Sequence, residues 1–169
     1  TAGAELGLPV RMRLVSFAFV GVEPEVMGIG PVPAAEKALR RAGLSVGELE
    51  AIVLTHWHPD HVAGLPPLLR RGGGRLTSRS TLRLFGPSPP SNAWWQALRG
   101  ASAWPFVSSL DVVEPGDLLE LGALRLETYP TDHGTRSIGW RFREADGGNR
   151  VVVIPGDSRP TEEIADAAR

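Results

Sequence analysis

The sequence predicts an α/β fold in which short strands alternate with helices. Residues 51–55, AIVLT, form a short apolar run that suits a buried strand, and a helical pattern follows from residue 60 or 61 to residue 71. Residues 124–129 alternate between apolar and polar side chains, as expected for a strand with one buried face. The chain has 169 residues, which is long enough to bury a substantial core.

The first 50 residues predict a strand, a loop and a helix. Residues 11–22 are rich in β-branched and aromatic side chains, which favours a strand. Residues 23–33 form a loop rich in glycine and proline, and a proline at its end opens a helix over residues 33–42. Ser45 can cap a short turn that follows this helix.

The second half of the chain predicts β-hairpins and a final helix. The first hairpin turns at Gly122 and the second at residues 146–149. Residues 86–105 are rich in proline and predict a loop with one helical turn near residues 94–98. The expected elements are strands at residues 82–85, 118–121, 124–129, 138–143 and 150–154, and a helix from residue 161.

The composition excludes several classes of chemistry. The chain has no cysteine, so it has no disulfide bond, thiolate zinc ligand or cysteine nucleophile. Its net charge of −1 indicates no global attraction to nucleic acid or membranes. No apolar run approaches the ~20 residues of a membrane span, and no signal-peptide pattern is present. We therefore expect no membrane association and a cytoplasmic location.

A cluster of potential metal ligands follows the predicted strand at residues 51–55. The sequence THWHPDHVAG places His56, His58, Asp60 and His61 within six positions. Because residues two apart in extended backbone point the same way, His56 and His58 can bind one ion. Asp60 and His61 lie where the chain turns into a helix and can face a second ion. Imidazole and carboxylate groups are typical ligands of zinc and similar ions.

Two further candidate ligands follow later strands. His133 occurs in the phrase YPTDHG and Asp157 in the phrase IPGDS. Taken alone, either residue is more often an ordinary polar or turn residue. Clustered imidazoles without a metal, in contrast, cost desolvation and, on protonation, repulsion. Because loops at strand ends can converge at one edge of a sheet sandwich, we expect both residues to join the metal site.

In this order, THWHPDHVAG, TDHG and PGDS resemble the metallo-β-lactamase superfamily. The phrase HGTRSIGW before the GDS turn most resembles its ribonuclease Z-like branch of phosphodiesterases. The resemblance covers about residues 51–169 and implies an αββα sandwich, here incomplete at both ends. It implies a hydrolase that acts on a phosphodiester at a one- or two-zinc site, with Mn²⁺ or iron as other possible ions. Asp157 would bridge the two ions.

The resemblance also implies roles for the other candidate ligands. His56, His58 and His133 would bind the first ion, and Asp60 and His61 the second. Asp60 would also be catalytic, because it could orient the attacking water or accept its proton. The family has a later histidine for the second ion, and this sequence has no histidine after His133. We therefore expect the second site to be the weaker one.

Residues 6–52 resemble a different family. The sequence GVEPEVMGIGPVPAAEKALRRAGLSVGELEAI is similar to part of the C-terminal half of thiolases. Thiolase chemistry needs cysteines, and this chain has none. We therefore expect residues 1–50 to be a structural segment and residues 51–169 to be a truncated metallo-β-lactamase-like domain. The join could be a natural fusion, an engineered chimera or an error of sequence assembly.

Three functions follow from these patterns. The first is a metal-dependent hydrolase of a small anionic or phosphodiester substrate, with nucleic acid as a possible substrate. The second is a non-catalytic, truncated or chimeric metal-binding chain. The third, a thiolase-type acyl-CoA enzyme, is disfavoured because cysteine is absent. Residues 62–110 contain six arginines and no acidic residue, and they form either a solvated surface or a docking face for an anionic substrate.

Overall fold

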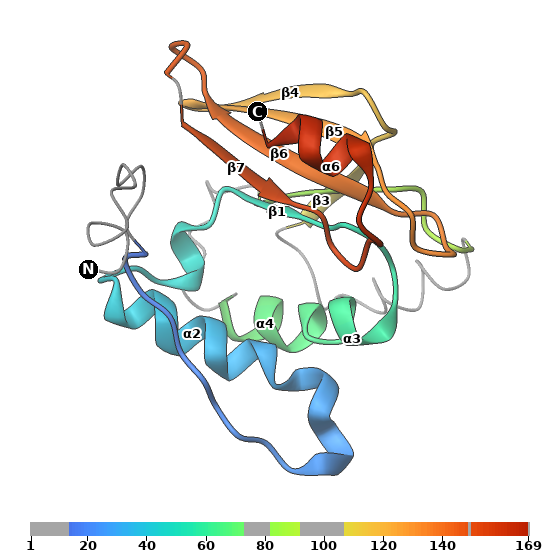
Figure 1. The fold of residues 1–169 in the computed structure, drawn as a ribbon. Helices are drawn as coiled ribbons and strands as arrows, with labels where there is room; N and C mark the ends of the chain where they lie inside the picture. The colour runs from blue at the N-terminus through green and yellow to red at the C-terminus, as the bar shows by residue number, and fades with distance from the viewer. Residues whose placement is uncertain (1–13, 73–81, 92–106, 149, 169) are drawn as a thin grey trace, which may run out of the picture.

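Two β-sheets lie face to face with helices on both outer sides (Figure 1). The computed structural model describes residues 14–72, 82–91, 107–148 and 150–168. Within these residues, one sheet has the strand order β1-β2-β3 and the other the order β4-β5-β6-β7. The predicted α/β sandwich is therefore confirmed.

The first sheet is parallel and consists of β1 (Ala51–Val53), β2 (Leu82–Gly86) and β3 (Val107–Val112). The sequence predicted β1 and β2 but assigned no element to β3. Two serines interrupt the apolar pattern of β3, and this strand forms because it pairs with β2, where Leu84 lies opposite Leu110. Such long-range pairing leaves little signal in the local sequence.

The second sheet is an antiparallel meander. It consists of β4 (Leu118–Leu121), β5 (Leu124–Pro130), β6 (Ile138–Glu144) and β7 (Val151–Ile154). Both predicted hairpins are present, and β5 and β6 also pair with each other. The first hairpin turns at Gly122, whose φ of 56° suits glycine.

The main core fills the space between the sheets. Trp140 is fully buried there. The predicted alternation in β5 holds in part: Leu126 and Thr128 are buried, but Leu124 is 43% exposed and Tyr129, predicted for the other face, is buried. The buried members of this core are Phe85, Val113, Leu126, Ile138 and Trp140. A second core lies between the parallel sheet and the helices α3 (Pro59–Val62) and α4 (Leu65–Gly72). Its buried members are Leu54, Trp57, Val62, Leu65, Leu82 and Leu84.

The predicted strand at residues 11–22 is wrong over residues 14–22, and residues 11–13 lie outside the described part. This segment has no regular secondary structure and runs beside α2 (Pro31–Arg41). The guanidinium of Arg41 donates to the carbonyl of Phe17 at 2.9 Å, so this carbonyl already has a hydrogen-bond partner other than a neighbouring strand. A β-rich composition does not form a strand without a partner strand.

Other boundaries differ from the prediction in smaller ways. Part of the predicted loop at residues 23–33 forms the 3-10 helix η1 (Pro24–Ile29), and α2 begins at Pro31 rather than Pro33. The predicted helix at residues 60–71 is divided into α3 and α4 at Ala63 and Gly64.

The remaining helices agree with the prediction. After Ser45, whose backbone N–H donates to Glu48 at 2.7 Å, the chain forms η2 (Val46–Glu48). The helix α6 (Glu162–Ala167) begins after Thr161, which accepts a bond from the backbone of Ile164. The helical turn expected at residues 94–98 lies outside the described residues. Among the described helices, none is long and apolar enough to span a membrane.

Candidate metal centre

The motif that contains His56, His58 and His61 begins just after β1, where hydrogen bonds join the two sheets. The indole Nε1 of Trp140 donates to the carbonyl of Leu54 at 2.9 Å, and the backbone N–H of Ile138 donates to the carbonyl of Thr55 at 2.9 Å. Both bonds join the parallel sheet to β6 of the antiparallel sheet. His56 therefore leaves the sheets from a backbone that is fixed on two consecutive residues.

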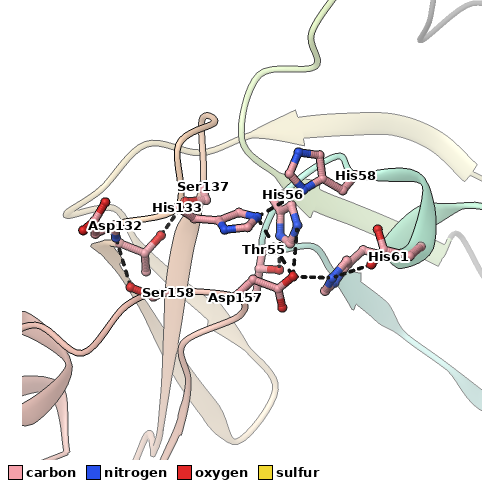
Figure 2. Close-up of polar contacts among 11 residues, drawn as sticks. Thr55, His56, His58, His61, Asp132, His133, Ser137, Asp157 and Ser158 are labelled. Atoms are coloured by element: carbon pink, nitrogen blue, oxygen red, sulfur yellow. Dashed lines mark hydrogen bonds and ion pairs between the residues drawn. The ribbon is translucent and has the colours of Figure 1, made fainter.

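Three histidines meet at this end of the sandwich (Figure 2). The ring centroid of His56 lies 4.8 Å from that of His58 and 4.6 Å from that of His133. His133 Nε2 lies 3.1 Å from His58 Nδ1. One nitrogen of each of the three rings lies within 4.8 Å of the other two. The three residues that the sequence assigned to the first ion are thus brought together.

Asp157 lies among the imidazoles. Its Oδ2 atom is 3.1 Å from His61 Nε2, 3.9 Å from His56 Nε2 and 4.0 Å from His133 Nε2. Partial desolvation raises the pKa of Asp157, but the imidazoles, with His61 foremost, hold it below its ordinary value. His56, His61 and Asp157 form a second group able to hold an ion, and His56 belongs to both groups.

Asp60 is the outermost of the predicted site residues. Its Oδ2 atom lies 3.6 Å from His61 Nε2, and 64% of its side chain is exposed. Asp60 belongs to neither ligand group of the described residues. The geometry thus places Asp60 beside the site, and its role as a ligand or a base stays a prediction.

His56 is fully buried, and its Nε2 atom has no hydrogen-bond partner among the described residues. Its Nδ1 atom lies 3.0 Å from the hydroxyl of Thr55. Burial, followed by repulsion from the imidazoles of His61, His133 and His58, lowers the pKa of His56 to about 4 against the opposing effect of Asp157. The ring is therefore neutral near pH 7. A neutral, buried and unpartnered nitrogen among other ligand atoms fits a metal ion.

The sequence reasoning missed the contacts that fasten the two later loops to each other. The hydroxyl of Ser158 accepts a bond from the backbone N–H of Asp132 at 3.0 Å, and the backbone N–H of Arg159 donates to the carbonyl of Asp132 at 2.9 Å. Asp132 precedes His133, and Ser158 follows Asp157, so these bonds fix the two candidate ligands relative to each other. In the sequence, the small polar residues of the phrases TDHG and GDS were the signal that could have indicated these contacts.

Thr55 and Gly156 were also missed as supporting residues. If Nε2 of His56 binds an ion, the ring proton must lie on Nδ1, which then donates to Thr55. Gly156 has a φ of 63°, and a Cβ atom on it would lie 2.9 Å from the Cβ of Thr55. Only glycine allows the loop before Asp157 to approach Thr55 so closely.

Within the arginine-rich stretch, residues 62–110, the structure describes the contacts of Arg83. Arg83 pairs with Asp111 at 2.9 Å and lies 4.5 Å above the ring of Phe85. These contacts favour the solvated-surface interpretation for Arg83. Arg75, Arg79 and Arg99 lie outside the described residues, as do the tryptophans of residues 94–104.

A first prediction concerns the stability of the metal-free chain below neutral pH. In the unfolded chain His56 takes up a proton near its ordinary pKa of 6.5, whereas in the folded chain it does so only near 4. The stabilisation from neutral His56 is therefore complete above 6.5 and is lost as the pH falls towards 4. Urea unfolding with a chelator at several pH values should show this loss. In His56→Gln, the free energy of unfolding should fall less over the same pH range. An equal fall in both chains would contradict the prediction.

The arrangement defines an αββα sandwich with a His/Asp cluster able to hold a metal ion, and the family follows from comparison with known proteins. The model of the metallo-beta-lactamase superfamily matches residues 27–169. The chain belongs to the metallo-beta-lactamase superfamily, which confirms the resemblance seen in the sequence. The match begins before residue 51, and the proposed division of the chain at residue 50 stays a prediction.

Two kinds of relative match different lengths of the chain. The chain is 31% identical to the ribonuclease Z of Methanopyrus kandleri over 137 residues, which are 76% of this chain and 42% of that protein. It is 54% identical to the 3-ketoacyl-CoA thiolase of Aliivibrio fischeri over 50 residues, which are 30% of this chain and 13% of that protein. Both predicted resemblances are confirmed, and the chain spans less than half of either relative.

A solved structure supports the fold. The short form of human tRNase Z aligns with 78% of this chain and 58% of its own chain, with a TM-score of 0.55 and 17% sequence identity. At this level of identity, the similarity concerns the fold alone.

Proposed function

We propose that this chain is a metal-dependent hydrolase that acts on a phosphodiester. The observation that carries the proposal is the convergence of three other imidazoles and one carboxylate around the unpartnered Nε2 atom of His56. The phosphodiester substrate is supported by the similarity to ribonuclease Z, and RNA is the corresponding natural polymer. Fold similarity alone does not define a substrate.

His56, His58 and His133 would hold the first ion, because three neutral imidazoles are a sufficient set for a catalytic zinc. When bound, zinc lowers the pKa of a coordinated water towards 7 and polarises the phosphoryl oxygen. Imidazole ligands also suit iron, and carboxylate ligands suit Mn²⁺, so both ions are alternatives.

His61 and Asp157 would hold the second ion, with Asp157 facing both positions because its Oδ2 lies 3.1 Å from His61 and 4.0 Å from His133. Asp60 lies on the exposed side of His61. From that position, its carboxylate can orient the attacking water or accept its proton.

We also propose that the protein is located in the cytoplasm.

The second candidate function is a metal-binding chain without catalysis. The observation that favours it is the small second ligand group, which among the described residues consists of His56, His61 and Asp157 and shares His56 with the first group. A hydrolysis assay separates the two functions, with bis(4-nitrophenyl) phosphate as a general phosphodiester and a single-stranded RNA as the polymer. Hydrolysis that follows zinc addition and stops with a chelator would support the hydrolase. Zinc binding without hydrolysis of either substrate would support the second function.

A second prediction concerns Asp157→Ala. This change should release the weaker ion while the first ion stays bound, because Asp157 belongs only to the group with His56 and His61. Loss of the bridging carboxylate also restores the repulsion between two neighbouring cations. The measurement is a zinc titration followed by metal analysis after dialysis. Two equally tight ions in the original chain would contradict the claim that one site is weak, and the absence of any bound ion would contradict the proposed function.

A further inference from the structure

The helix that carries Asp60 and His61 is too short to hold its own position. α3 contains four residues, Pro59–Val62, and thus about one turn. A single turn fixes several backbone angles in exchange for very few hydrogen bonds, so it is unstable without tertiary contacts. The orientation of His61 towards Asp157 must therefore depend on what α3 packs against.

The segment that packs against α3 comes from the thiolase-like part of the chain. Figure 1 shows η1 and the start of α2 beside α3, on the side away from the sheets. A Cβ atom on Gly28 would lie 3.4 Å from the Cβ of Ala63, so the two backbones are close at this point. Gly28 of η1 therefore lies in van der Waals range of the residue that follows α3.

Val32 makes the second contact. It is the buried residue of α2, with 4% of its surface exposed. Its Cγ2 atom lies 3.1 Å from the position that a Cβ atom on Gly64 would occupy. Gly64 directly follows α3 and precedes α4, so Val32 fills the space beside the junction of the two helices. A small groove of about 160 Å³ beside this contact is lined by residues that include Val32, Gly64, Asp60 and His61.

The two ligand groups differ in how they are supported. His56 is fully buried and follows backbone that β6 holds by two hydrogen bonds. His61 has a side chain that is 30% exposed and lies on α3. A displacement of α3 acts directly on His61 and reaches the first group only through His58, which directly precedes the helix, so it should affect the second group more.

We propose that Gly28 and Val32 are positioning residues for the second metal site, because they hold α3 so that His61 faces Asp157. This inference rests on the proposed function, since it concerns the affinity of the second ion. It also gives the thiolase-like segment a role within the superfamily domain. That role needs no cysteine and no acyl-CoA chemistry.

The test is a pair of complementary substitutions at one contact. Gly64→Ala adds a methyl group 3.1 Å from Val32, and Val32→Ala leaves a void at the same place. Each single variant should weaken the second ion about tenfold, as expected for outer-sphere changes, and should weaken the first clearly less. The double variant should recover most of the lost affinity, because the methyl group of residue 64 then occupies space vacated by Val32. Met27→Ala is the matched control, since Met27 lies in the same segment and is 71% exposed.

Two readouts separate this inference from the proposed function. Zinc titration measures the two affinities, and NMR of the imidazole nitrogens follows His61 and His56 in the metal-free chain. We expect the His61 signals to shift in the single variants and to return in the double variant, while those of His56 stay constant. Two bound ions with unchanged affinities in the single variants would overturn the positioning role alone. Equal weakening of both ions, without recovery in the double variant, would also overturn it. A chain that binds no zinc at all would overturn the proposed function together with this inference.

Discussion

Replacement of His56 with alanine is expected to abolish tight binding of any ion, whereas replacement of His58 with alanine should leave one ligand group complete. His56 Nε2, which can bind one ion at a time, belongs to both ligand groups, so neither group stays complete without it. His58 belongs only to the group with His133. Loss of a direct ligand should lower the affinity by more than about 100-fold, since loss of an outer-sphere partner already costs 10–100-fold. Zinc titration of both variants, with metal analysis after dialysis, measures the effect.

The comparison of the two variants also tests how the ligands are shared. In His58→Ala, the group of His56, His61 and Asp157 remains intact and should still retain an ion weakly. If His56→Ala retains one ion with unchanged affinity, the two groups do not share this residue. If both variants lose both ions equally, the two sites are not separable and the assignment of ligands to two ions is wrong.

The local sequence predicted His56, His58 and the neighbouring candidate ligands because these residues lie within six positions of one another. His56 and His58 are two residues apart, and extended backbone directs such residues to the same side, although β1 itself ends at Val53 and both histidines lie in the loop after it. His133 and Asp157 required a further step, namely that loops after different strands meet at one edge. The structure places them together, with 4.0 Å between His133 Nε2 and Asp157 Oδ2. The role of each residue as a ligand stays a prediction.

The elements that the sequence did not predict depend on partners distant in the chain. β3 forms because it pairs with β2, and its two serines give no apolar pattern of their own. Residues 14–22 have the composition of a strand but bind to α2, because no neighbouring strand pairs with them among the described residues. The division between α3 and α4 was also missed. It occurs at Gly64, where Val32 of a remote helix makes close contact.

The supporting residues of the site were missed for a related reason. Thr55 contacts the ring of His56 from the neighbouring position, but a threonine at the end of a strand has no specific signal. Ser158 contacts the backbone of Asp132 across 26 residues of sequence. A sequence shows which residue types are available for such contacts, whereas the pairing depends on the assembled sheets. The candidate ligands were therefore easier to predict from the sequence than the residues that position them.

Replacement of Trp140 with alanine is expected to cost about 3–5 kcal/mol of folding free energy, as for other large aromatic side chains removed from cores. Trp140 is fully buried between the sheets, and its indole donates to the carbonyl of Leu54 at 2.9 Å. Since single domains are stable by only about 5–15 kcal/mol, this loss should lower the urea midpoint strongly. Trp140→Phe is the matched variant, because it keeps an aromatic ring in the core while it removes the N–H donor and part of the indole volume. It should cost about 1–3 kcal/mol for the unsatisfied carbonyl of Leu54. Because Leu54 lies two residues before His56, Trp140→Phe should also weaken binding of the first ion in zinc titrations under conditions where the chain stays folded. Unchanged zinc affinity in that variant would show that the indole supports the core without positioning the metal-binding loop.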